Sequence, residues 1–276
     1  MSETLTAFLS KAPGILVEIE AVKGSSPREA GTFMLVSPTR IWETIGGGQF
    51  EYMAIDHARA MLEGRTEIDV LDIPLGPEIG QCCGGRTLLR FTRVTDAVAD
   101  ALTKRMQDAA DQQPAVFIFG AGHVGKALAD SLSLLPLTVS VVETRQEELV
   151  GLSGSVSTHL TAMPEAMVKD IPAGGTAIIV THDHALDFLI AKEALARDDL
   201  AYIGMIGSKT KRATFASWLA REGHVGTLDN LMLPIGGTIV KDKRPAVIAA
   251  LVTAEVLHAI HRSALPTAVQ FGSAPR

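Results

Sequence analysis

Three glycine-rich stretches in the first third of the chain carry the residues best suited to bind a ligand. They are Gly24–Arg28 (GSSPR), Gly46–Gly48 followed by Glu51, and Gly80–Gly85 (GQCCGG), which contains Cys82 and Cys83. Consecutive glycines can turn a row of backbone N–H groups toward an anion. Two adjacent thiols suit a soft metal or a sulfur atom. The same residues also fit a purely structural role, in which one cysteine is buried and the glycines form hairpin turns.

A fourth glycine pattern, Gly120–Gly125 (GAGHVG), follows an apolar run at Val116–Phe119 and precedes a helical pattern. In dinucleotide-binding folds, the first glycine of such a loop permits a tight turn and the second lets the backbone approach a pyrophosphate. The third lets the helix pack closely on the strand. Glu143 ends the next predicted strand, where an acidic side chain would hydrogen-bond a ribose. A packing turn that binds no nucleotide accounts for the same residues.

Two further polar turns follow later apolar runs. In Thr181–His184 (THDH), His182 and His184 could ligate a metal, or His182 and Asp183 could form an acid/base pair. A turn capped by Asp183 or Asp187 is the alternative.

The second of these turns, Gly207–Arg212 (GSKTKR), brings cationic side chains to the start of a helix. It could dock an anionic group. It also fits a helix capped by Ser208 and followed by a solvated basic turn.

The elements that must position these residues form two groups along the chain. Before residue 110, alternating and helical apolar spacing predicts strands at 14–22, 33–36, 41–45, 68–73 and 86–92 and helices at 50–62 and 96–109. After Pro114, continuous apolar runs at 116–119, 139–142, 177–180 and 202–206 alternate with helical patterns at 126–135, 186–196, 211–221 and 245–261. We therefore predict an α/β protein, with a small N-terminal α+β domain (1–110) and a Rossmann-like, doubly wound parallel-sheet domain (115–265).

The composition excludes several classes of protein. With 47% hydrophobic and 20% charged residues among 276, the chain has an ordinary globular composition. A formal net charge of −6 leaves no electrostatic footprint for nucleic acid. We find neither a secretory signal pattern nor an apolar run of membrane-spanning length, and the two cysteines fit a reducing compartment. We therefore expect a cytoplasmic protein with no nucleic-acid or membrane partner.

The motifs, in this order, resemble those of the xanthine dehydrogenase accessory family, the XdhC/CoxI type. The resemblance spans residues 10–260 and rests on Gly24–Glu29, Ile45–Gly48 with Glu51, Gly80–Gly85, Phe119–Gly125 and Pro234–Gly236. The Gln-Cys-Cys-Gly-Gly run and the triple glycine are closer to the xanthine dehydrogenase branch than to the carbon monoxide dehydrogenase branch.

The resemblance implies an accessory chaperone rather than an enzyme. Such a protein would bind the molybdenum cofactor (molybdopterin) and protect it while a cysteine desulfurase helps to install its terminal sulfur. It would then hand the cofactor to xanthine dehydrogenase. The resemblance puts Cys82 or Cys83 near the molybdenum or its sulfur, Arg28 and Gly46–Gly48 at a polar rim of the cofactor, and Gly120–Gly125 on its phosphate. We also expect a homo-oligomer, with a dimer as the commonest closed form.

These inferences define one set of candidate residues. The candidate cofactor-binding residues are Arg28, Gly46, Gly47, Gly48, Glu51, Gln81, Cys82, Cys83, Gly120, Gly122, His123, Gly125, Glu143 and His182. The candidate metal ligands are Cys82 and Cys83. Family members commonly follow the Pro-Ile-Gly motif with Leu-Asp-Ile-Gly, and later have Pro-Glu-Glu-Ile-Ala. This chain carries Thr238, Val240 and Ala246 in those stretches, so the carboxylates are absent.

Two other functions fit part of the sequence. An NAD(P)-dependent oxidoreductase would bind NAD(P) or another nucleotide at the Gly120–Gly125 loop with Glu143, and would use His182 or His184 as acid/base. That function leaves the first half of the chain without a role. A redox sensor built on Cys82 and Cys83 ranks last, because the Cα atoms of adjacent residues lie only ~3.8 Å apart and disulfides usually span more.

Overall fold

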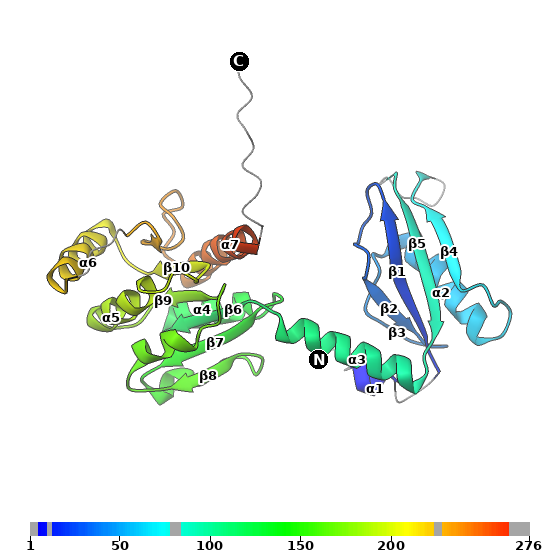
Figure 1. Ribbon diagram of the computed structural model, residues 1–276, viewed down its shortest axis with the longest axis horizontal. Helices are drawn as coiled ribbons and strands as arrows, with labels where there is room; N and C mark the ends of the chain where they lie inside the picture. Colours follow the sequence, from blue (N-terminus) through cyan, green and yellow to red (C-terminus); the bar gives the residue numbers. More distant parts are fainter. Residues whose placement is uncertain (1–4, 10–12, 78–83, 224–227, 265–276) are drawn as a thin grey trace, which may run out of the picture. The chain divides into compact units, whose positions relative to one another are not determined.

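The computed structural model describes residues 5–9, 13–77, 84–223 and 228–264 (Figure 1). The chain forms two compact units, Met1–Ala109 and Ala110–Arg276. Each unit has its own sheet and its own hydrophobic core, and each is described by itself below.

The N-terminal unit is built on a five-stranded antiparallel sheet in the order β3-β2-β1-β5-β4. The strands are β1 (Ile15–Lys23), β2 (Phe33–Val36), β3 (Ile41–Trp42), β4 (Val70–Pro74) and β5 (Arg86–Arg93). The period of two predicted for the first strand is confirmed, since Ile15, Val17 and Ile19 all lie in one core cluster. Helix α2 (Gly48–Leu62) covers this face of the sheet with Phe50, Ala54, Ala58 and Met61.

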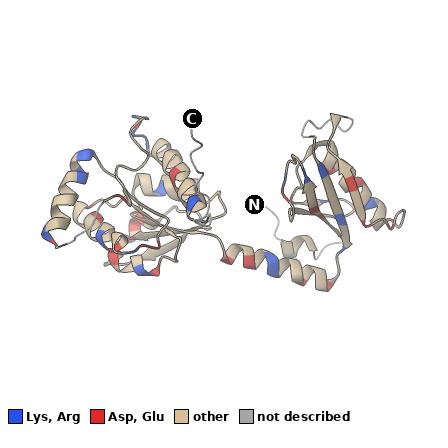
Figure 2. Cartoon of the chain, turned by 45° about the horizontal axis from the view of Figure 1, so that its top comes forward, with Lys and Arg blue, Asp and Glu red and all other residues tan. Residues whose placement is uncertain are grey.

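A second, smaller cluster joins Leu16 and Leu35 of the sheet to two other helices. These are α1 (Leu5–Leu9) and α3 (Asp96–Asp111), whose Leu102 is buried in this cluster. The rest of α3 carries both acidic and basic side chains (Figure 2). The helix continues to Asp111, two residues beyond the predicted end at residue 109.

The C-terminal unit contains a six-stranded parallel sheet in the order β11-β10-β9-β6-β7-β8. Its strands are β6 (Ala115–Phe119), β7 (Thr138–Glu143), β8 (Ser157–Leu160), β9 (Thr176–Ile179), β10 (Tyr202–Met205) and β11 (Leu231–Met232). This is the strand order of a Rossmann fold, and it reverses between β6 and β9. The prediction of an α/β protein with a Rossmann-like second domain is therefore confirmed.

Helices cover both faces of the parallel sheet. Val116 and Ile118 of β6 pack with α4 (His123–Leu132) and α7 (Pro245–Ala264). On the opposite face, Phe117 and Phe119 pack with α5 (His184–Leu195), α6 (Lys209–Arg221) and the 3-10 helix η3 (Pro164–Asp170). Burial on both faces explains why β6 is a continuous apolar run rather than an alternating one. The η2 turn (Gln146–Leu149) follows β7.

Helix α7 departs from one expectation. By length and composition, Pro245–Ser263 could cross a membrane, whereas we expected no such segment. The helix buries Ala249, Val252 and Val256 in the core that it shares with α4. One such helix is weak evidence for a membrane span, because a helix of a soluble α/β domain meets the same criteria.

Candidate functional site

The loop between β6 and α4 has the geometry of an anion-binding turn. Gly120 has φ +111°, and a Cβ there would lie 2.6 Å from the Val180 carbonyl oxygen. A Cβ on Gly125 would lie 2.0 Å from the Gly120 carbonyl oxygen, so the start of α4 packs directly on the turn. A Cβ on Gly122 would meet nothing within 4 Å. Gly120 and Gly125 are therefore needed for packing, while Gly122 leaves room for a ligand over the N-terminus of α4.

Glu143, at the end of β7, connects the β6–α4 loop to the residues that follow β7. Its carboxylate is buried and accepts from the Ala121 N–H at 2.8 Å and the Thr144 N–H at 2.8 Å. The Thr144 hydroxyl and the backbone and guanidinium of Arg145 donate at 3.1–3.4 Å. Burial by itself raises the pKa of Glu143, but the donors Ala121, Arg145 and Thr144 outweigh it and lower the pKa to about 2.

This hydrogen bonding bears on the ribose contact expected of Glu143. A carboxylate offers about four lone-pair sites, and both oxygens of Glu143 already accept hydrogen bonds from the protein. A ribose hydroxyl would have to displace one of these donors. In this structure Glu143 positions the glycine loop.

His182 lies close to Gly120 and Glu143 at the carboxyl edge of the sheet. The three residues line a depression of only about 10 Å³, roughly the space of one water molecule, so a larger ligand would lie over it. His182 and His184 are exposed. Asp183 accepts a hydrogen bond from the Ala185 N–H at 2.7 Å and caps α5, as the structural alternative for this turn predicted. In the described part of the chain, no three His, Cys, Asp or Glu side chains are grouped to hold a metal.

The sequence did not reveal a buried ion pair at this edge. Lys211 and Asp187 form a charged hydrogen bond, with side chains 8% and 1% exposed. Lys211 also donates to the Ile206 carbonyl at 2.9 Å, and Asp187 accepts from the Thr181 N–H at 3.1 Å. Ser208 accepts from the Lys211 N–H and caps α6, as predicted. These contacts tie together the loops that follow β9 and β10.

A signal for this pair was present in the helix patterns. Asp187 has the spacing of the buried residues Ile190, Ala191 and Ala194 on α5. Lys211 has the spacing of the buried residues of α6 in the same way. An acid and a base at core positions of neighbouring helices indicate a pair, because unpaired buried charges are costly.

In the N-terminal unit, the triple glycine forms a turn that leads into α2. Gly46, Gly47 and Gly48 have φ values of 134°, 72° and 70°, which favour glycine. Glu51, on the first turn of α2, accepts from the Ile45 N–H at 3.0 Å, the Gly47 N–H at 3.3 Å and the Thr44 hydroxyl. Glu51 thus holds the turn in place.

The glycine-rich stretches of the N-terminal unit meet at one end of its sheet. A Cβ on Gly46 would lie 2.8 Å from the Pro27 side chain, so the triple-glycine turn packs on the Gly24–Arg28 turn. A Cβ on Gly85 would lie 2.0 Å from the Ser25 carbonyl oxygen. Ser25 also forms an isolated β-bridge with Gly84. Stretches separated by 20 to 60 positions in the sequence are therefore in contact.

Arg28 and the cysteines belong to these stretches. Arg28 is exposed, and within the described residues its guanidinium has no ion-pair partner. Gln81, Cys82 and Cys83 lie outside the described residues. Among the described residues, the Gly84 N–H donates to the Leu75 carbonyl at 2.9 Å and the Leu75 N–H donates to the Gly85 carbonyl at 2.8 Å.

The candidate residues therefore fall into two groups, one in each unit. The N-terminal unit brings together Arg28, Gly46, Gly47, Gly48 and Glu51. The C-terminal unit brings together Gly120, Gly122, His123, Gly125, Glu143 and His182.

Comparisons with known proteins identify relatives of both units. The XdhC Rossmann domain family matches residues 116–256, and the XdhC and CoxI family matches residues 9–73. The uncharacterized protein YqeB of Escherichia coli (strain K12) is 26% identical over 263 residues. That similarity covers 89% of this chain but only 43% of YqeB, so the chain spans less than half of that relative.

The fold has also been seen in a crystal structure. A structure described as a xanthine dehydrogenase from Bacillus halodurans superposes with a TM-score of 0.78, covering 98% of this chain and 99% of that one. At 17% sequence identity, this similarity shows a shared fold. The XdhC Rossmann domain match alone covers more than half of the chain, and a second match of the same family lies in the first unit. The chain therefore belongs to the XdhC family.

Proposed function

We propose that this protein is an accessory protein of a xanthine dehydrogenase, and that it binds the molybdenum cofactor, supports its sulfuration and delivers it to the dehydrogenase. Membership of the XdhC family, matched in both units, supports the accessory role. The partners would be xanthine dehydrogenase, a cysteine desulfurase and a second copy of the chain, in the cytoplasm. The protein would act as a chaperone rather than as an enzyme.

One observation carries the proposal. The Gly24–Arg28 turn and the triple-glycine turn, which the family resemblance assigns to the cofactor, pack on each other, and Gly85 after the cysteines packs on Ser25. At Gly46 and Gly85 a Cβ would clash with a neighbouring turn, so close contact of these turns requires glycine. Such contact is expected of a built site rather than of independent surface turns.

The residues present fit the chemistry of the cofactor. Arg28, exposed and without an ion-pair partner among the described residues, would hold an anionic or carbonyl group of the cofactor. Considered by itself, the C-terminal unit offers a phosphate the N-terminus of α4, which is open above Gly122. Cys82 or Cys83 would supply a thiolate near the metal. When bound, the cofactor supplies the molybdenum and its terminal sulfur, while Glu51 and Glu143 keep the two glycine turns in shape.

The test is to purify the full chain from a host that makes the cofactor. Molybdenum is measured by mass spectrometry, and the pterin by the fluorescence of its oxidised form. We expect both to copurify in comparable amounts. Arg28→Ala, Cys82→Ser and Cys83→Ser should be compared with Arg65→Ala, which removes an exposed arginine paired with Glu63 in the same unit.

The expected result is loss of molybdenum and pterin from Arg28→Ala and from at least one cysteine variant, with Arg65→Ala unchanged. A wild-type protein without molybdenum and pterin would contradict cofactor binding. If both cysteine variants kept the wild-type content and still delivered the cofactor to apo-dehydrogenase, the thiol role would be wrong.

An NAD(P)-dependent oxidoreductase is the second candidate, because Gly122 leaves the N-terminus of α4 open in the manner of a dinucleotide site. The full occupation of Glu143 by protein donors argues against a ribose contact there. Saturable, micromolar NAD(H) or NADP(H) binding by a protein that carries neither molybdenum nor pterin would favour this alternative.

A further inference from the structure

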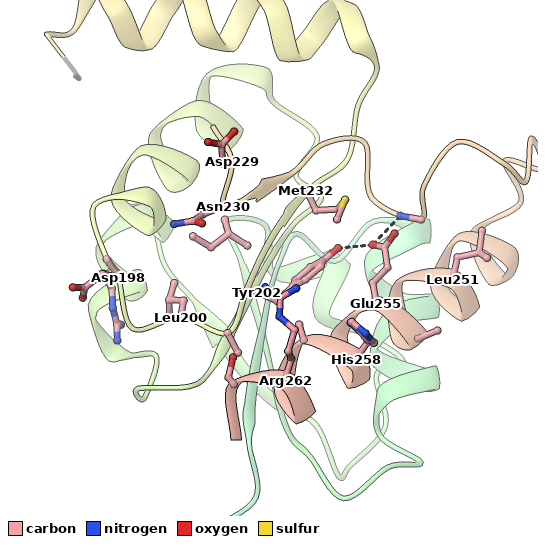
Figure 3. A pocket seen from close by; sticks show the side chains of 17 residues that line it. Asp198, Leu200, Tyr202, Asp229, Asn230, Met232, Leu251, Glu255, His258 and Arg262 are labelled. Atoms are coloured by element: carbon pink, nitrogen blue, oxygen red, sulfur yellow. Dashed lines mark hydrogen bonds between the residues drawn. The ribbon is translucent and has the colours of Figure 1, made fainter. Parts of the chain in front are cut away.

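A cavity of about 660 Å³ opens on the C-terminal unit, and residues 120–125 are not part of its lining. Figure 3 shows this cavity. Its lining residues come from three segments, 197–203, 229–236 and 251–263, which contain parts of β10, β11 and α7. Pockets of ~300–1,000 Å³ commonly hold ligands the size of a nucleotide. The proposed function gives this cavity no role.

One wall of the cavity carries a carboxylate held in a defined orientation. The Tyr202 hydroxyl donates to Glu255 Oε2 at 2.6 Å, and the Gly236 N–H donates to the same oxygen at 3.1 Å (Figure 3). Burial, followed by the hydrogen bond to Glu255, raises the pKa of Tyr202 above its ordinary value, so the tyrosine remains a neutral donor. In the described residues Oε1 of Glu255 has no hydrogen-bond donor. That oxygen is free to accept from N–H groups of a ligand.

The same face of α7 supplies an arginine and a histidine. His258 and Arg262 lie about one helical turn apart, both are exposed, and neither has an ion-pair partner in the described part of the chain. Arg197 also lines the cavity, but it pairs with Asp199 and donates to two backbone carbonyls. Arg262 is therefore the cation available to an anionic group, and His258 adds a ring nitrogen beside it.

Polar and apolar side chains share the lining of the cavity, and the polar ones include the carboxylates of Asp198 and Asp229. Leu200, Met232, Leu251 and the ring of Tyr202 line it (Figure 3). Side chains of this kind contact both faces of a flat ring. Asn230 adds a carboxamide, which can both donate and accept hydrogen bonds.

We propose that this cavity binds a flat heteroaromatic ring that carries N–H groups and an anionic tail. The ring packs among Tyr202, Met232 and Leu251, its N–H groups donate to Glu255, and the tail lies by Arg262 and His258. A purine nucleotide and a pterin phosphate share this chemistry. The pterin form of the ligand rests on the proposed function, and the nucleotide form is independent of it.

The test is titration calorimetry of the full chain with two probes, guanosine monophosphate and pterin-6-carboxylate. Ala254→Leu fills the cavity, while Ala250→Leu adds the same bulk to another exposed position on α7 outside it. His258→Ala is matched in the same way by His261→Ala, an exposed histidine of α7 that does not line the cavity.

We expect saturable binding of at least one probe. Ala254→Leu and His258→Ala should each weaken it about tenfold or more, and the two control variants should leave it unchanged. Binding of the nucleotide alone identifies a nucleotide site, and binding of the pterin alone identifies a pterin site. If neither probe binds saturably below about 1 mM, or if Ala254→Leu binds as tightly as the wild type, the assignment is wrong.

Molybdenum content, measured on the same preparations, separates the two proposals. Probe binding without copurified molybdenum contradicts only the cofactor role. Copurified molybdenum without probe binding contradicts only the assignment of this cavity.

Discussion

The buried pair of Asp187 and Lys211 gives a quantitative test of what holds the carboxyl edge of the parallel sheet together. With side chains 1% and 8% exposed, neither charge can be solvated if its partner is removed. Truncating one partner of a buried pair costs ~3–5 kcal/mol. We therefore expect Asp187→Ala to lower the free energy of unfolding of the C-terminal unit by that amount. At ~2–4 °C per kcal/mol, this corresponds to a fall in Tm of roughly 6–20 °C.

A double variant distinguishes the cost of an orphaned charge from the value of the pair. Replacing a buried pair by apolar side chains of similar volume is often neutral, or stabilises by ~1–4 kcal/mol. Asp187→Leu with Lys211→Met should therefore be far more stable than the sum of the two single changes predicts. The Thr181 N–H loses its acceptor in every Asp187 variant. This loss lowers the free energy of unfolding by ~1–3 kcal/mol, and the double variant does not regain it.

The assay must report on the C-terminal unit alone, because a chain of two units need not unfold in one step. Trp218 lies in the affected core, with ring centroids 5.6 Å from Phe188 and 6.0 Å from Phe215. The other tryptophan of the chain, Trp42, lies in the N-terminal unit. Urea unfolding is therefore followed by tryptophan fluorescence in a Trp42→Phe background.

An exposed pair serves as the control. Lys192 and Glu222 lie 3.1 Å apart with side chains 33% and 44% exposed, so Glu222→Ala should cost at most ~1 kcal/mol. If Asp187→Ala costs no more than this control, water reaches the Asp187–Lys211 pair, and the burial argument is refuted.

Three further experiments, two of them comparisons between glycine variants, test the glycine turns and Glu143. Gly125→Ala should lower the free energy of unfolding by ~3 kcal/mol or more, because the added Cβ would lie 2.0 Å from the Gly120 carbonyl oxygen. Gly122→Ala should leave stability unchanged, because its Cβ would meet nothing within 4 Å, but it should weaken the binding of a phosphate at the N-terminus of α4. Glu143→Gln should lower stability at pH 7 and flatten its decline in acid. A carboxyl group whose folded pKa is lowered stabilises the fold above its ordinary value of 4.5, and that contribution is lost as the pH falls toward 2. Gly46→Ala should cost ~1–3 kcal/mol more than Gly64→Ala, because both have positive φ but only the first would contact a proline side chain.

Each of these expectations has a contrary outcome. Equal stability of the Gly125 and Gly122 variants in thermal unfolding would mean that the loop is not packed as described. A Glu143→Gln protein that loses stability between pH 4.5 and pH 2 as steeply as the wild type would assign that loss to other carboxyl groups. If Gly46→Ala and Gly64→Ala lowered the free energy of unfolding equally, the triple-glycine turn would not be packed tightly on Pro27.

Much of the architecture could be predicted from local patterns. The apolar run of β6, the glycine loop after it and the helical spacing of α4 are contiguous in the chain, and each depends on the periodicity of one element. Caps such as Asp183 and Ser208 are also local, because the capped N–H lies two or three residues away. The fold class and the position of the Gly120–Gly125 loop between a strand and a helix therefore followed from the sequence.

The short edge strands β8 and β11 could not be predicted in this way. β8 is largely exposed and has no apolar face, and β11 contains only two residues. Both are strands because a neighbouring strand offers a parallel partner, which is a property of the sheet rather than of the segment.

The sequence by itself determined the longer helices, the central strands and the Gly120–Gly125 loop, since these depend on side-chain periodicity and local turn chemistry. Only the tertiary structure decided that Gly46 packs on Pro27 and Gly85 on Ser25, and that Asp187 pairs with Lys211. It likewise decided that the carboxylate of Glu143 accepts hydrogen bonds from Ala121 and Arg145 of the protein itself. These contacts join segments far apart in the chain, and their partners depend on which strands and turns lie next to one another in the fold, which no local pattern records.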